Sequence, residues 1–172
     1  MQKTPMILLC MLAIFAGQSN SAQQPKSTRI LNPAGVCGLV TKAEIEEAIG
    51  TSIGYGVPQM AREADVCTYS DPKGTKVNVL LSRSKKPRDL SKAVEQAKKG
   101  VPNATVREIP GLGDKALLVE SPAGPTMFSI YHGGDALVVS VYGLQAGPKT
   151  EAAAEKIARK AFKHIPPAAP VK

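Results

Sequence analysis

The spacing of apolar residues changes several times along the chain, and each change predicts a different element. Apolar positions recur at helical spacing over residues 45–49, 90–97 and 154–165, whereas apolar and polar positions alternate with a period of two over 52–83 and 105–142. The sequence therefore predicts a helix, three strands, a second helix, three or four strands and a final helix.

The first predicted helix has recognisable ends. Thr41 and Glu44 have the spacing of a capping box, in which the threonine side chain accepts from the backbone N–H of Glu44 and the carboxylate reaches back. Val40 and Ile45 occupy the hydrophobic-staple positions, and Gly50 supplies a left-handed stop. We expect a short helix between Thr41 and Gly50.

Three strands are expected after this helix. Ile53, Tyr55 and Val57 alternate with glycines in the first, and apolar runs at 66–69 and 77–81 form the other two. The sequence Asp-Pro-Lys-Gly between the last two has the composition of a tight turn, so it predicts an antiparallel hairpin.

The second half of the chain predicts four further strands and a long helix. The strands are expected at residues 105–109, 115–120, 126–132 and 135–142. Gly133 and Gly134 separate the last two and accept the positive φ of a type I′ turn. The final helix, 148–164, carries one apolar stripe, formed by Ala154, Ile157, Ala158, Ala161 and Ile165. The fold class is therefore α+β, with an antiparallel sheet of about six strands flanked by two or three helices and with two halves that look like a loose internal duplication.

The N-terminus has the layout of a secretory signal peptide. Lys3 precedes an apolar run at 6–16, which is too short to span a membrane, and small residues follow. We divide the chain into a signal peptide (1–22), a flexible lead-in (23–36), one α+β domain (37–165) and a disordered tail (166–172). No transmembrane segment is expected after cleavage, and the location should be periplasmic or secreted.

Composition adds two constraints. The formal charge is +8, and loss of Lys3 with the signal leaves +7, so the mature domain is basic. Aromatic residues make up only 4% of the chain and Trp is absent, so the core has to consist mainly of Val, Leu, Ile and Ala.

Two cysteines remain once the signal containing Cys10 is removed. Cys37 and Cys67 are expected to pair as a disulfide, because an exported chain meets an oxidising compartment. A redox or metal role is the alternative, but neither the C-x-x-C spacing nor a set of three or four close ligands is present. We expect no metal and no cofactor.

Three segments together resemble a group of small exported bacterial domains of unknown function. They are the Cys-Gly-Leu-Val-Thr-Lys-Ala-Glu-Ile segment from Cys37 to Ile45, Cys67-Thr68-Tyr69, and the Pro-Gly-Leu-Gly-Asp-Lys-Ala segment from Pro110 to Ala116. Such domains are similar in fold to the photosystem-associated PsbP proteins and the Ran-binding Mog1 proteins. The resemblance implies an antiparallel sheet flanked by helices and an exported location, but no activity.

The glycine-rich segment invites a phosphate-loop interpretation. Gly111, Gly113 and Asp114 precede a predicted strand rather than a helix, and the segment lacks the Gly-Lys-Ser/Thr ending of a P-loop. We interpret it as a structural turn, in which the glycines permit unusual backbone angles and Asp114 caps neighbouring amides.

His132 and His164 are the only histidines of the chain. His132 lies beside the Gly133–Gly134 turn and next to Asp135, so a proton-transfer or ligand role can be imagined. Neither histidine has a nucleophile or a second ligand close to it in sequence, so a structural role is the simpler hypothesis.

Basic residues gather in and around the second and third helices. Such a surface would attract anionic partners, although aromatic side chains that stack on bases or enter a membrane interface are missing from these helices. A solvated, solubilising surface is the alternative. The residues are Lys85, Lys86, Arg88, Lys92, Lys98, Lys99, Lys156, Arg159, Lys160 and Lys163.

These observations predict a non-catalytic envelope protein that binds a partner or ligand. Two alternatives stay open: a small periplasmic enzyme centred on His132, and an accessory protein that associates with anionic envelope surfaces through its basic helices. Nucleic acid is not an expected partner.

Overall fold

The computed structural model describes residues 35–61, 64–73, 77–84, 90–101 and 103–165. All of them belong to one compact unit, Leu31–Lys172. The predicted signal peptide, the lead-in up to residue 34 and the predicted tail lie outside the described residues, as do Lys85, Lys86 and Arg88.

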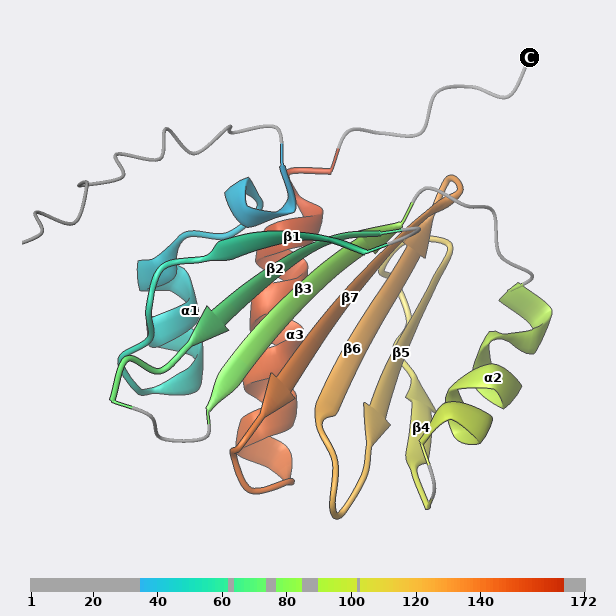
Figure 1. The fold of residues 1–172 in the computed structure, drawn as a ribbon. Coiled ribbons are helices and arrows are strands. Elements are labelled where there is room, and N and C mark those ends of the chain that lie inside the picture. The colour runs from blue at the N-terminus through green and yellow to red at the C-terminus, as the bar shows by residue number, and fades with distance from the viewer. Residues whose placement is uncertain (1–34, 62–63, 74–76, 85–89, 102, 166–172) are drawn as a thin grey trace, which may run out of the picture. The chain divides into compact units, whose positions relative to one another are not determined.

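The described residues form helices and strands in nearly the predicted order (Figure 1). The α-helices are α1 (Lys42–Ile49), α2 (Ala93–Gly100) and α3 (Pro148–Phe162), and two short 3-10 turns are η1 (Val36–Gly38) and η2 (Leu90–Lys92). The strands are β1 (Val57–Ala61), β2 (Ala64–Ser70), β3 (Asn78–Ser84), β4 (Thr105–Glu108), β5 (Lys115–Glu120), β6 (Thr126–His132) and β7 (Asp135–Tyr142).

The strands form one antiparallel sheet in the order β1-β2-β3-β7-β6-β5-β4. The first half of the chain supplies one meander, β1 to β3, and the second half supplies another, β4 to β7. The two meanders meet where β3 pairs with β7, with Leu81 opposite Val139. The α+β class is therefore confirmed, with seven strands rather than about six.

One face of the sheet carries the main core. Because paired residues of neighbouring strands point to the same face, the register places Cys67, Leu81, Val139, Phe128 and Leu118 in one row. All five are buried and pack in one cluster with the apolar stripe of α3. Figure 1 shows α3 lying behind the sheet, with α1 beside it. The stripe of α3 consists of Ala154, Ile157, Ala158 and Ala161, and Ile165, which the sequence predicts as its continuation, lies just beyond the end of α3 and packs in the same cluster.

The local signals of the sequence are borne out at two turns. Thr41 and Glu44 form the capping box, and Gly50 ends α1 with a φ of 72°. Gly133 and Gly134 have φ values of 54° and 87°, which fit the type I′ turn expected between β6 and β7.

The first strand starts later than its alternation predicts. β1 begins at Val57, and Ile53 and Tyr55 lie in the preceding loop. Their alternation arises because Ile53 enters the core while Tyr55 is 77% exposed. The loop passes so close to β2 that a Cβ on Gly56 would lie 2.6 Å from the Sγ of Cys67. Gly56 therefore serves close packing, and the backbone N–H of Gly54 donates to the carbonyl oxygen of Ser70 at the end of β2, at 2.7 Å.

Candidate functional site

The segment before α1 is fastened to β2 by a covalent and a polar link. Cys37 and Cys67 form a disulfide with Cα atoms 5.1 Å apart, which confirms the predicted pairing. The buried Tyr69 hydroxyl donates to the carbonyl oxygens of Cys37 and Val40, at 3.1 and 3.0 Å. Burial, with a smaller contribution from the charge of Glu44, raises the pKa of Tyr69 to about 12. The Cys-Thr-Tyr segment therefore has a structural role.

We predict that Tyr69→Phe lowers the free energy of unfolding by about 1–2 kcal/mol, because buried carbonyl oxygens lose their donor. Urea titration of the purified domain measures the change. Tyr55→Phe is the matched control, since that ring is exposed, and it should change stability by less than about 0.5 kcal/mol. Equal losses in both variants would contradict the assigned role of the Tyr69 hydroxyl.

The glycine-rich segment holds the β6–β7 hairpin. The backbone N–H of Asp114 donates to the carbonyl oxygen of Tyr131 at 2.7 Å, and Oδ2 of Asp114 accepts from the backbone N–H of Gly133 at 2.7 Å. Gly111 and Gly113 both have positive φ. These contacts support the structural-turn interpretation of Gly111, Gly113 and Asp114.

The same loop brings an aspartate to His132. The Nδ1 atom of His132 lies 3.4 Å from Oδ1 of Asp114, and the ring meets Phe162 edge-on with centroids 5.5 Å apart. His132 also pairs across the hairpin with Asp135, which binds Arg83 at 2.9 Å. An aspartate beside one imidazole nitrogen can orient the ring for proton transfer. The sequence hid this neighbour because the two residues meet only through the pairing of the β5 and β6 segments.

His164 lies elsewhere, exposed beyond the end of α3. In the described part of the chain, no group of three or more His, Cys, Asp or Glu side chains is arranged to hold a metal ion.

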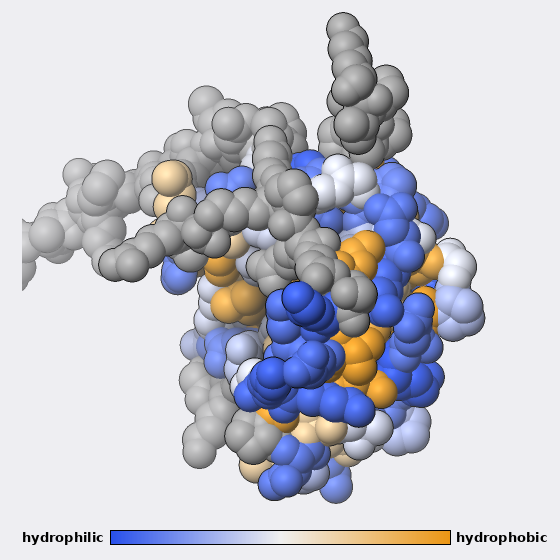
Figure 2. Space-filling model, turned by 90° about the vertical axis from the view of Figure 1, so that its right-hand side faces the viewer, coloured by the Kyte–Doolittle hydropathy of each residue, from blue (hydrophilic) through white to orange (hydrophobic). Residues whose placement is uncertain are grey.

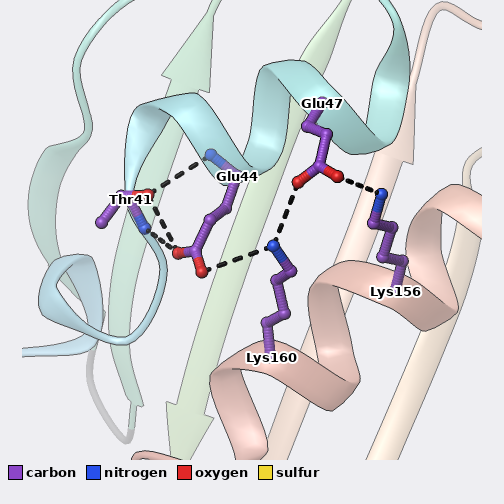
Figure 3. A network of polar contacts seen from close by, with 5 residues as sticks. All are labelled: Thr41, Glu44, Glu47, Lys156 and Lys160. Atoms are coloured by element: carbon purple, nitrogen blue, oxygen red, sulfur yellow. Dashed lines mark hydrogen bonds and ion pairs between the residues drawn. The ribbon is translucent and has the colours of Figure 1, made fainter.

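The lysines of α3 face the glutamates of α1 (Figure 3). Lys156 binds Glu47 at 2.9 Å, and Lys160 binds Glu47 at 3.1 Å and Glu44 at 3.5 Å. Hydrogen bonds from the two lysines lower the pKa of Glu47, and the hydrogen bond from Lys160 to Glu47 raises the pKa of Lys160. This pairing leaves less positive charge for an anionic partner than the sequence suggests, although Lys163 stays exposed.

The basic residues of α2 lie beside a different part of the sheet from those of α3. α2 contacts β4 at the sheet edge, whereas α3 packs mainly against β6 and β7. Lys98 and Lys99 are exposed, and Lys99 pairs with Glu95 at 2.6 Å. Viewed from the α2 side, the surface is largely hydrophilic with apolar patches between (Figure 2). The two basic helices therefore do not combine into one surface.

A groove of about 910 Å³ opens between the end of α1 and the segment that leads from β7 into α3. Its lining is dominated by small or apolar side chains, with a few polar groups at the rim. The lining residues are Glu47, Ala48, Ile49, Gly50, Leu144, Gln145, Ala146, Gly147, Pro148, Lys149, Thr150, Ala152 and Ala153. Sequence reasoning missed this groove, because its two walls come from segments almost a hundred residues apart.

Glu46 fixes the exit of the chain from α1. Its Oε1 atom accepts from the backbone N–H of Ile53 at 2.9 Å, from the Ser52 hydroxyl at 3.0 Å and from Lys42. These hydrogen bonds, with the one from Lys42 first, lower the pKa of Glu46 to about 2.

This lowered pKa predicts an acid-dependent loss of stability. The Glu46 carboxylate contributes fully above its ordinary pKa of 4.5, and its contribution is lost as pH falls through about 2. Glu46→Gln should therefore destabilise the domain at pH 7 and flatten the fall in stability between pH 5 and pH 2, as measured by urea titration at each pH. Glu95→Gln, in an exposed pair on α2, should leave the profile unchanged. Parallel profiles for Glu46→Gln and the unmodified protein would contradict this role.

A second hollow, of about 440 Å³, lies near the disulfide, and its lining includes Cys37, Tyr55, Gly56 and Tyr69. It is bordered by the ion pair of Lys42 and Glu46. The polar side chains here already have partners, Tyr69 and Glu46 in the contacts given above and Thr41 in the capping box with Glu44.

None of the helices in the described residues is long and apolar enough to cross a membrane. Comparison of the chain with family models, with curated proteins and with solved structures gives no match.

Proposed function

We propose that this chain is an exported, non-catalytic binding domain whose ligand occupies the groove between α1 and the β7–α3 segment. The observation that carries the proposal is the groove itself. Its volume of about 910 Å³ lies at the upper end of the range of small-molecule sites, which are concave and mostly apolar with few polar groups.

The disulfide supports the exported location. Such bonds persist in oxidising compartments, and the leader-like pattern of residues 1–22 points to the same destination. Cys37–Cys67 also braces the segment before α1, so the helix that forms one wall of the groove is held in place without a ligand.

The test is saturable binding of a neutral apolar probe. N-phenyl-1-naphthylamine fluorescence, titrated with the mature protein, should show one site per chain. Ala152→Trp places a large ring in the groove and should weaken binding at least about tenfold, whereas Ala123→Trp, in the exposed turn between β5 and β6, should not. Absence of saturable binding, or equal binding in both tryptophan variants, would contradict the proposal.

The His132–Asp114 contact favours a second candidate, a small enzyme centred on His132. In that case the mature protein turns over a substrate in a broad hydrolase or redox screen, and the activity is lost in His132→Ala and Asp114→Asn but kept in His164→Ala. Such a result would replace the binding proposal, while turnover that survives His132→Ala would exclude this candidate.

A further inference from the structure

We infer that the ligand of this groove is a small anionic amphiphile, with its acidic group at Lys149 and its apolar part across Ile49 and Leu144. The inference rests on the proposed function and specifies the chemistry of its ligand.

The charge at the rim favours an anion. Lys149 is exposed and makes no ion pair with any described residue. The one acidic residue of the lining, Glu47, binds Lys156 and Lys160, and Lys160 also binds Glu44, so the charges of these two lysines and two glutamates balance. Lys149 is therefore the charge of the lining that has no ion-pair partner among the described residues, in a chain whose formal charge is +8.

Two further carboxylates lie near the start of α3. Glu120 and Glu151 are not part of the lining, and Arg107 pairs with Glu151. Burial, and then the hydrogen bond with Glu151, raises the pKa of Glu120. Glu120 is hydrogen-bonded to the backbone of Gly147, a lining residue, and Glu151 is paired with Arg107, so both carboxylates already have partners.

The floor of the groove requires an apolar part in the ligand. Ala48, Ile49 and Leu144 pack against the core yet remain only partly buried, and they line the groove. Ala146 and Ala152 are exposed in the lining, and their small side chains fill little of the groove. A single inorganic anion would leave these apolar side chains in water, whereas an alkyl chain or ring covers them.

The concave shape points to a free molecule rather than a membrane. A lipid bilayer is contacted by residues that protrude from a protein, but Ile49 and Leu144 line a hollow. The ligand is therefore a monomeric amphiphile that enters the groove.

The experiment compares three decyl compounds below their micelle concentrations as competitors of N-phenyl-1-naphthylamine on the mature protein. Decanoate should bind about threefold or more tighter than decyltrimethylammonium, with neutral decyl maltoside between them. Lys149→Gln should weaken decanoate binding about threefold and leave decyl maltoside unchanged. Lys163→Gln, which removes an exposed lysine outside the lining, is the matched control and should change neither.

Three results would overturn the inference. They are equal binding of decanoate and decyltrimethylammonium, equal effects of Lys149→Gln and Lys163→Gln, and binding to vesicles of anionic lipid without binding of monomeric decanoate. The proposed function fails separately, through loss of saturable binding of the neutral probe or its indifference to Ala152→Trp. Far-UV circular dichroism of each variant verifies that it folds.

Discussion

Replacing Cys37 and Cys67 together with alanine is expected to lower the free energy of unfolding by about 3.5 kcal/mol and the melting temperature by about 10–15 °C. The bond joins residues 30 apart, and its loss frees that loop in the unfolded chain. Cys67 is also fully buried, so its truncation removes contacts from the core. Thermal and urea unfolding of both proteins measure the effect.

Reduction of the unmodified protein provides the control. Dithiothreitol should produce most of the same loss in the parent and none in the double variant. Tyr69 still donates to the carbonyl oxygens of Cys37 and Val40, so the native fold should persist in both cases. A double variant as stable as the oxidised parent would show that the disulfide adds no stability to this domain.

Gly113→Ala is expected to cost about 3 kcal/mol or more, against about 1 kcal/mol for Gly111→Ala. Both glycines have positive φ, at 64° and 74°, so both alanines experience similar backbone strain. They differ in their surroundings. A Cβ at Gly113 would collide with the carbonyl oxygen of Tyr131 and lie 2.9 Å from Cγ2 of Ile130, whereas nothing lies within 4 Å of one at Gly111.

Urea titration measures the free energy of unfolding of both variants. The difference between them gives the cost of the Cβ collision at Gly113, because the backbone strain is similar in both. Gly113→Ala should also disturb the contact of Asp114 with His132, which nuclear magnetic resonance of the imidazole can follow. Similar losses at both positions would mean that the β6–β7 hairpin moves aside, and that the segment from Gly111 to Asp114 does not hold the hairpin in a fixed position.

The sequence predicted most of the second half of the fold because its local signals agree with one another. β5, β6 and β7 have the expected bounds, since turn residues interrupt clear apolar runs at each end. The capping box similarly defined the start of α1. In each case the decisive information lies within a few neighbouring residues.

The first strand shows where this reasoning fails. Ile53 and Tyr55 alternate in exposure because one packs into the core and the other faces outward from a loop, and periodicity cannot separate that case from a strand. β1 itself contains Pro58, a residue of low strand propensity that an edge strand tolerates. Its pairing with β2 therefore had to come from the structure.

The candidate site depended still more on tertiary contacts. The sequence singled out the cysteines, Asp114 and His132, and the structure joined each pair. The sequence contained no sign of the groove, because Ile49 and Leu144 meet only when α1 packs beside α3. The lysines of α3 looked available for an anionic partner because their partners on α1 lie more than a hundred residues earlier.

The division of the sheet into two meanders has a consequence for how the chain matures. Both cysteines belong to the first meander and its preceding turn, whereas the centre of the sheet needs β7, which lies more than fifty residues beyond β3. Synthesis proceeds from the N-terminus, so the disulfide can form before β7 has been synthesised. Closure of the disulfide therefore does not require the strand that completes the sheet.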